Sequence, residues 1–84
     1  MSEKARLATD CEIAALIRAR RKSKNLTQQQ VADRADMNIR HYQHFEGGER
    51  SLVTASFFTT MAVLAALEID PDSFIRAYVK VYRK

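Results

Sequence analysis

The sequence predicts an all-α fold, a single domain of five helices. The chain has 84 residues, which can bury one modest core and leave no room for a catalytic domain joined to a regulatory one. Hydrophobic residues make up 46%, with only two glycines and one proline, a composition that favours helices over a turn-rich β-sandwich or disorder. Apolar residues recur at helical spacing behind successive capping residues. We therefore expect one domain over residues 1–84, with a core at 10–69 and a C-terminal helix at about 71–83.

The first helix is expected to begin after Asp10, which is a good N-cap residue. Its apolar positions recur at helical spacing: Ile13, Leu16 and Ile17. Basic residues crowd the segment 18–24, where the dipole of the helix favours cations. Asn25 tolerates a left-handed backbone better than most residues, so we expect the helix to end there.

A second helix is expected to follow Thr27, because Thr27 and Gln30 have the spacing of a capping box. Its inward face consists of small residues, Val31, Ala32 and Ala35, which permit close packing but bury little apolar surface alone. The second helix must therefore pack against a neighbour.

A tight turn at Asp36 and Met37 leads to Asn38, a strong N-cap for a third helix over about 39–45. Met37 is the expected apolar plug of the turn. In the third helix Tyr42 and Phe45 face inward, with the Tyr42 hydroxyl near the surface. The outward positions have side chains that can read base edges in the DNA major groove through guanine, adenine or the thymine methyl group. These positions are Ile39, Arg40, Gln43 and His44.

The segment 51–69 is expected to contribute most to the core, in a helix that starts at about residue 54. Its large apolar residues are Leu52, Phe57, Phe58, Met61, Leu64 and Leu67. Asp70 and Pro71 then suit the N-cap and first position of a fifth helix. That helix has more apolar and aromatic surface than one small domain easily buries, so a homodimer is expected. The expected dimer interface is Phe74, Tyr78, Val81 and Tyr82.

The charge balance favours a polyanionic partner. The formal net charge is +4 and the sequence pI is about 9.6, although a solvated helix face is the alternative explanation of the basic run. Cys11 is the only cysteine, which excludes an internal disulfide and suggests a small packing residue in a reducing compartment. The chain has no secretory signal and no membrane-spanning run, so we expect a cytoplasmic protein. We expect no cofactor and no metal, because His41 and His44 have no third ligand at suitable spacing.

Residues 16–69 resemble the Cro and phage-repressor (XRE-type) helix-turn-helix domains of bacterial and phage regulators. The matching segments lie in four of the expected helices: residues 16–21, 26–32, 42–48 and 61–69. The resemblance implies a lambda-repressor-like fold whose third helix enters the major groove of double-stranded DNA. It also implies a transcriptional regulator that binds a pseudo-palindromic operator as a homodimer.

The resemblance also implies roles for individual residues. Ile39 and Arg40 occupy the leading base-contact positions, with Gln43 and His44 one turn later. Gln28 would bind a DNA phosphate and brace a residue of the third helix. The remaining phosphate contacts would come from Asn38, Gly47 and Arg50. An ion pair between Arg21 and Glu46 would be structural.

Three departures from the family pattern affect these expectations, one of which is the bulky run 41–44 in the middle of the third helix, where many relatives have smaller residues. Asp36 replaces the glycine usual in the turn, and aspartate tolerates the left-handed backbone less well than glycine. Ile39 stands where a polar base-reading residue is common, which shifts the expected readout there toward methyl contact or DNA shape.

Other functions remain as alternatives. The architecture is similar to that of restriction-modification controller proteins. An antitoxin that binds both an operator and a toxin ranks second. Antitoxins often carry an additional toxin-binding segment, whereas here only about nine residues precede the expected first helix and none extends far past the fifth. A protein-interaction module would use the third or fifth helix as a docking face, against which the basic first helix and polar third helix argue. An enzyme has almost no support, since the sequence shows no nucleophile with its base, phosphate loop or carboxylate pair.

Overall fold

A computed structural model describes the backbone of residues 2–82 and the side chains of residues 11–76. The described backbone is all-helical, with five helices and no strand, as expected. The helices are α1 (Ser2–Ser23), α2 (Gln28–Arg34), α3 (Ile39–Gly47), α4 (Phe57–Ala66) and α5 (Pro71–Tyr82).

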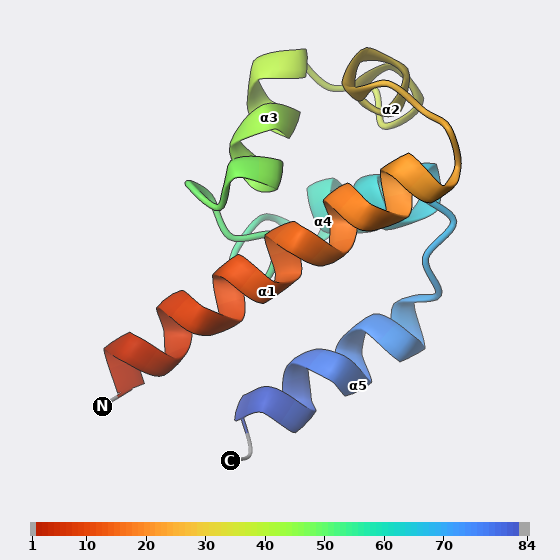
Figure 1. The fold of residues 1–84 in the computed structure, drawn as a ribbon. Helices are drawn as coiled ribbons and strands as arrows, with labels where there is room; N and C mark the ends of the chain where they lie inside the picture. The colour runs from red at the N-terminus through yellow and green to blue at the C-terminus, as the bar shows by residue number, and fades with distance from the viewer. Residues whose placement is uncertain (1, 83–84) are drawn as a thin grey trace.

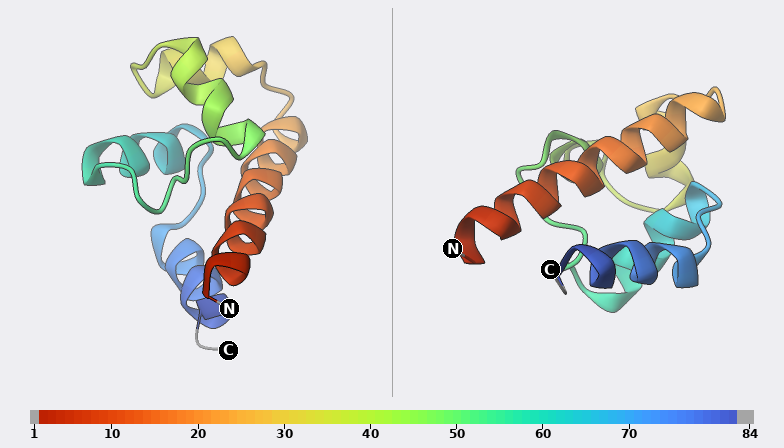
Figure 2. Two further views of the ribbon diagram at one scale, coloured as in Figure 1. Left: turned by 90° about the vertical axis from the view of Figure 1, so that its left-hand side faces the viewer. Right: turned by 60° about the horizontal axis from the view of Figure 1, so that its bottom comes forward.

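The long helix α1 crosses the whole molecule (Figure 1). It packs against α3 and α5, while α2 packs between α3 and α4. Figures 1 and 2 show α5 running beside the N-terminal half of α1, so that both ends of the chain lie on the same side of the molecule. The pair formed by α2 and α3 lies at the other end of α1. The fold therefore separates the α2–α3 pair from the α5 surface.

The expected start of the first helix was wrong, because α1 begins at Ser2 and passes through Asp10 without a break. Residues 3–8 are Glu, Lys, Ala, Arg, Leu and Ala, all good helix formers, so no boundary is required at Asp10. Cys11 is exposed and is not the packing residue that was expected. Leu16 is 41% exposed, whereas its neighbour Ile17 is fully buried.

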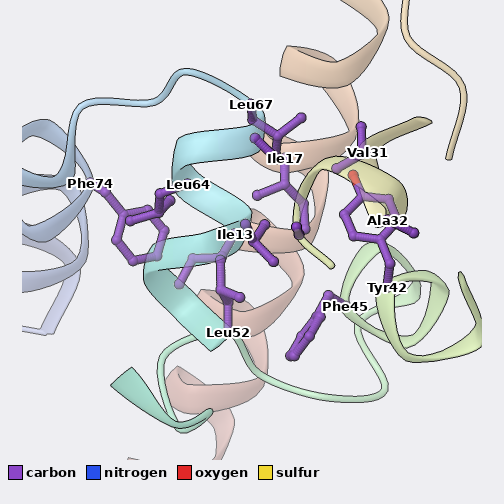
Figure 3. Close-up of a cluster of buried hydrophobic side chains, with 13 residues drawn as sticks. Ile13, Ile17, Val31, Ala32, Tyr42, Phe45, Leu52, Leu64, Leu67 and Phe74 are labelled. Carbon is purple, nitrogen blue, oxygen red and sulfur yellow. The ribbon is translucent and has the colours of Figure 1, made fainter. Parts of the chain in front are cut away.

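The core gathers side chains from all five helices and from the loop before α4 (Figure 3). Helix α1 contributes Ile13 and Ile17, and the loop contributes Leu52. The remaining labelled members are Val31, Ala32, Tyr42, Phe45, Leu64, Leu67 and Phe74. Met37 packs against this cluster at the turn, as the sequence predicted.

Helix α4 is shorter than the sequence predicted, and its two phenylalanines are exposed. Ser56 caps it by accepting a hydrogen bond from the Thr59 backbone N–H at 3.2 Å, so the helix begins at Phe57. Phe57 is 72% exposed and Phe58 83% exposed, and their rings contact each other edge to face. Their assignment to the core was wrong, because they occupy the first turn of α4, which projects beyond the other helices in Figure 2.

Helices α1 to α4 end in the same way, each followed within two residues by a residue with a left-handed backbone. These residues are Asn25, Asp36, Gly48 and Glu68, with φ between 56° and 81°. In each case the next backbone N–H donates to the carbonyl five residues earlier, as Met37 N does to Ala32 O at 2.9 Å. This Schellman arrangement satisfies carbonyl groups that the helix end would otherwise leave unpaired.

Replacing Asp36 by glycine is expected to raise the free energy of unfolding by about 0.5–1 kcal/mol, because glycine adopts a positive φ without steric cost. The reverse control is Gly48→Ala, whose added Cβ would lie 3.9 Å from the Cβ of Ala14, an ordinary contact. Its expected loss of about 1 kcal/mol would therefore come from the backbone alone. Urea unfolding of the three proteins measures both changes, and a destabilised Asp36→Gly variant would contradict the prediction.

Candidate nucleic-acid interface

Helices α2 and α3 each have an N-terminal cap and are joined by a tight turn. Thr27 and Gln30 form the expected capping box at the start of α2, with Thr27 Oγ1 accepting from Gln30 N at 3.1 Å. Asn38 caps α3, because its Oδ1 accepts from Arg40 N at 2.8 Å. Between the helices the chain reverses through the left-handed Asp36. These local bonds fix the angle at which α3 is presented.

The outward face of α3 exposes three of the four residues expected to read bases. Arg40, Gln43 and His44 are exposed. Ile39 is half-buried and packs against the core, so only part of its side chain is open to a ligand. His44 Nε2 lies 3.8 Å from Glu49 Oε1, a pair that is ionic only when the histidine is protonated.

A buried carboxylate lies behind this face. Glu46 is 3% exposed and forms an ion pair with Arg21, whose Nε lies 2.5 Å from Glu46 Oε2. Arg21 Nη2 also donates to Glu46 Oε1 at 3.2 Å, so the contact is bidentate. Arg21 and Glu46 therefore tie the end of α1 to the end of α3, the structural arrangement that the family resemblance implied.

Tyr42 completes this cluster from within α3. Its hydroxyl donates to Glu46 Oε2 at 2.5 Å, and the side chain is fully buried. The expectation that this hydroxyl lies near the surface was therefore wrong. Burial alone would raise the pKa of Glu46, but hydrogen bonds from Arg21, Tyr42 and Gln28 outweigh burial and hold that pKa below its ordinary value. Burial and the bond to Glu46 raise the pKa of the Tyr42 hydroxyl.

Gln28, the expected phosphate contact, is held at both ends of its side-chain amide. Its Nε2 donates to Glu46 Oε1 at 3.1 Å, and its Oε1 accepts from Gln43 Nε2 at 3.0 Å. The brace expected from Gln28 to the third helix therefore reaches Gln43. Sequence spacing alone did not identify the bond from Gln28 to Glu46.

The other candidates for phosphate contact lie around the ends of α3. Asn38 precedes its first turn, Gly47 is its last residue, and Arg50 is exposed in the following loop. Part of the basic run 18–24 contacts residues just after α4 and not the outward face of α3. Arg20 donates to the carbonyls of Leu67 and Glu68 at 3.1 and 2.8 Å, and Lys24 forms an ion pair with the Glu68 carboxylate. Arg20 therefore satisfies two carbonyls just beyond the end of α4, and Lys24 pairs with the side chain of one of the same residues, roles that charge counting did not predict.

The expected dimer residues are only partly within the described side chains. Phe74 is buried at 6% exposure and belongs to the core, so it is not a surface residue of α5. The side chains of Tyr78, Val81 and Tyr82 lie outside the described residues. Ile75, next to Phe74, is 56% exposed. It borders an apolar groove of about 350 Å³ whose other walls include Val53, Phe57 and Met61.

Among the described residues, no group of histidine, cysteine or acidic side chains is placed to hold a metal ion. None of the described helices is both long enough and apolar enough to cross a membrane.

A family model described as a helix-turn-helix domain matches residues 12–74, which include α2, the turn, α3 and α4. No curated protein and no solved structure matches the chain. The match covers most of the chain and agrees with the capped helices and turn of the structure. The chain therefore belongs to the helix-turn-helix domain family, a family of DNA-binding domains.

Proposed function

We propose that the protein is a sequence-specific transcriptional regulator that binds a pseudo-palindromic DNA operator as a homodimer. The observation that carries the proposal is the outward face of α3, where Arg40, Gln43 and His44 are exposed on a rigidly capped helix. Arginine and glutamine offer the paired hydrogen-bonding groups that recognise guanine and adenine in the major groove. Recognition rather than chemical transformation of the DNA is what this set of side chains can do.

Phosphate contacts would supply the part of the affinity that does not depend on sequence. The first residue of α2 bonds Gln43 on the outward face of α3, Arg50 N bonds the carbonyl of His44, and the chain has a net charge of +4. Cationic contacts of this kind make binding weaken as salt increases. Salt-dependent binding to any duplex, with a preference for one sequence superimposed, is the expected behaviour.

Selection of bound sites from random duplex DNA tests the proposal directly. We expect a consensus with two inverted half-sites whose centres lie about one DNA turn, roughly 34 Å, apart or a multiple of it. Bound pools with no sequence preference would overturn sequence-specific regulation. A single half-site would overturn the homodimer alone.

A second copy of the chain is the proposed occupant of the α5 surface. Ile75 and Phe57 are large apolar side chains left exposed at the rim of the same groove, and burying such a rim against its symmetric copy removes it from water. The described part of α5 thus moves the proposed contact from Phe74 to its neighbour Ile75. Tyr78, Val81 and Tyr82 remain part of the proposed interface.

Replacing Ile75 by glutamate is expected to weaken dimerisation at least about 10-fold, because a charge would be desolvated in the interface. Sedimentation equilibrium over a concentration series measures the change. Leu16→Glu is the matched control, since Leu16 is also an exposed apolar residue but does not line the groove. Equal dissociation of both variants, or a monomeric wild type at tens of micromolar with and without DNA, would contradict the proposed interface.

A further inference from the structure

The Glu46 carboxylate receives four hydrogen bonds from three side chains. Arg21 donates twice, Tyr42 once and Gln28 once. An ionised carboxylate can only accept hydrogen bonds, so every group that faces it must be a donor. The depressed pKa of Glu46 agrees with an ionised carboxylate at neutral pH.

This restriction determines the orientation of the Gln28 amide. If that amide were rotated by half a turn, Gln28 Oε1 would face Glu46 Oε1 across about the 3.1 Å now spanned by the hydrogen bond. Two acceptors would then meet in a part-buried site with no proton between them, which is costly. Gln28 must therefore direct Nε2 toward Glu46 and Oε1 away from it.

The same reasoning passes from Gln28 to Gln43. Gln28 Oε1 is an acceptor, so Gln43 must direct Nε2 toward it, as the 3.0 Å bond shows. No other side chain among residues 11–76 bonds the second N–H or the carbonyl oxygen of Gln43. An N–H paired with a carbonyl oxygen is the combination that glutamine uses to recognise adenine through N7 and N6.

We propose that Glu46 is a positioning residue for base recognition, acting through Gln28 to fix the orientation in which the Gln43 amide presents its N–H and its carbonyl oxygen to DNA. The inference rests on the proposed DNA-reading function of α3. It gives a second role to a carboxylate that also stabilises the fold through Arg21. Gln43 is then a pre-oriented reader, and the base pair it contacts is expected to be A·T, with adenine on the contacted strand.

The hydrogen-bond chain can be tested in the free protein, without DNA. Nuclear magnetic resonance of the wild type is expected to show a nuclear Overhauser contact between the Gln43 side-chain amide protons and the Gln28 side chain. The contact should disappear in Gln28→Met, which keeps the length of the side chain but has no amide. Absence of the contact in the wild type would overturn the inference whatever the protein does with DNA.

The effect on recognition can be tested with a double-mutant cycle. The probes are duplexes obtained by site selection with the wild type. The pair read by Gln43 is identified as the base pair whose substitution weakens binding by the wild type but not by Gln43→Ala. Glu46→Gln retains size but adds an N–H that permits Gln28 to invert. We expect it to lower discrimination at that pair about 3- to 10-fold, part of what one bidentate contact supplies.

The cycle separates positioning from a general loss of stability. In the Gln28→Met background, Glu46→Gln should cause no further change at the pair read by Gln43, because the connection is already broken. Tyr42→Phe is the matched control. It removes a donor from Glu46 Oε2 but leaves the Gln28 bond, so it should lower stability without changing discrimination at that pair.

The outcomes are distinguishable. A wild type without sequence preference refutes the proposed function. If the wild type has a sequence preference but Glu46→Gln changes discrimination at that pair equally in the wild-type and Gln28→Met backgrounds, the positioning role is refuted. If Glu46→Gln does not fold, Gln28→Met must by itself lower discrimination at the pair read by Gln43 more than at other pairs, and an even loss overturns the inference.

Discussion

Replacing Glu46 by alanine is expected to lower the free energy of unfolding by about 3–5 kcal/mol, the usual cost of removing one partner from a buried ion pair. Glu46 is 3% exposed, and its loss would leave Arg21 and Tyr42 without their acceptor in the interior. Domains of this size have a total stability of about 5–15 kcal/mol, so the variant should be close to unfolding at room temperature. Urea denaturation followed by circular dichroism measures the loss.

Glu49 supplies the matched control for this prediction. It is a glutamate three residues further along the chain, its side chain is 69% exposed, and among the described side chains its ionic neighbour is His44 at 3.8 Å. Glu49→Ala should therefore change stability by less than about 0.5 kcal/mol. A similar loss in the two variants would mean that buried pairing with Arg21 does not stabilise the fold.

The starts of α2, α3 and α5 could be predicted because they depend on local chemistry. Thr27 with Gln30, Asn38, and Asp70 with Pro71 each cap a helix by bonds between residues that are close in sequence. Such bonds form wherever the residue types and spacing allow them. The start of α1 was missed because residues 3–8, which precede the possible cap Asp10, are good helix formers and continue the helix back to Ser2.

The burial of large apolar residues could not be predicted from spacing, because it depends on where each helix meets its neighbours. Phe57 and Leu64 are seven residues apart and share a face of α4, yet Phe57 is 72% exposed and Leu64 2%. Only the second lies where other helices cover α4. Phe74 was likewise placed on the wrong surface, because two apolar stripes on α5 give no sign of which one faces the core.

The candidate site was likewise predictable from the sequence only in part. The outward direction of Arg40, Gln43 and His44 follows from helical spacing once Tyr42 and Phe45 are placed inward. The connection of Gln43 to Glu46 does not, because the two residues meet through Gln28, which belongs to another helix. A contact made through a third residue leaves no periodic pattern in the sequence.

Replacing Arg40 by alanine is expected to weaken binding to the preferred operator by about 1–3 kcal/mol, roughly 5- to 150-fold in Kd. Arg40 is exposed in the first turn of α3. The Asn38 side chain fixes the backbone of that turn, because its Oδ1 accepts a hydrogen bond from Arg40 N at 2.8 Å. From this position a guanidinium can contact guanine O6 and N7 together. Since the side chain is exposed, its removal should leave the unfolding free energy nearly unchanged, so the loss can be assigned to recognition.

The matched control for Arg40 is Arg50, an exposed arginine in the loop after α3 that we expect to contact phosphate. Each substitution removes one positive charge, so electrostatic attraction to DNA falls equally in the two variants. Arg50→Ala should weaken binding to all sequences alike and lower the slope of log K against log salt by about 1. Arg40→Ala should lose more on the operator than on random duplex, and should lose its preference at one base pair. Equal losses on both kinds of DNA would place Arg40 on the phosphate backbone and leave base discrimination to Gln43 and His44.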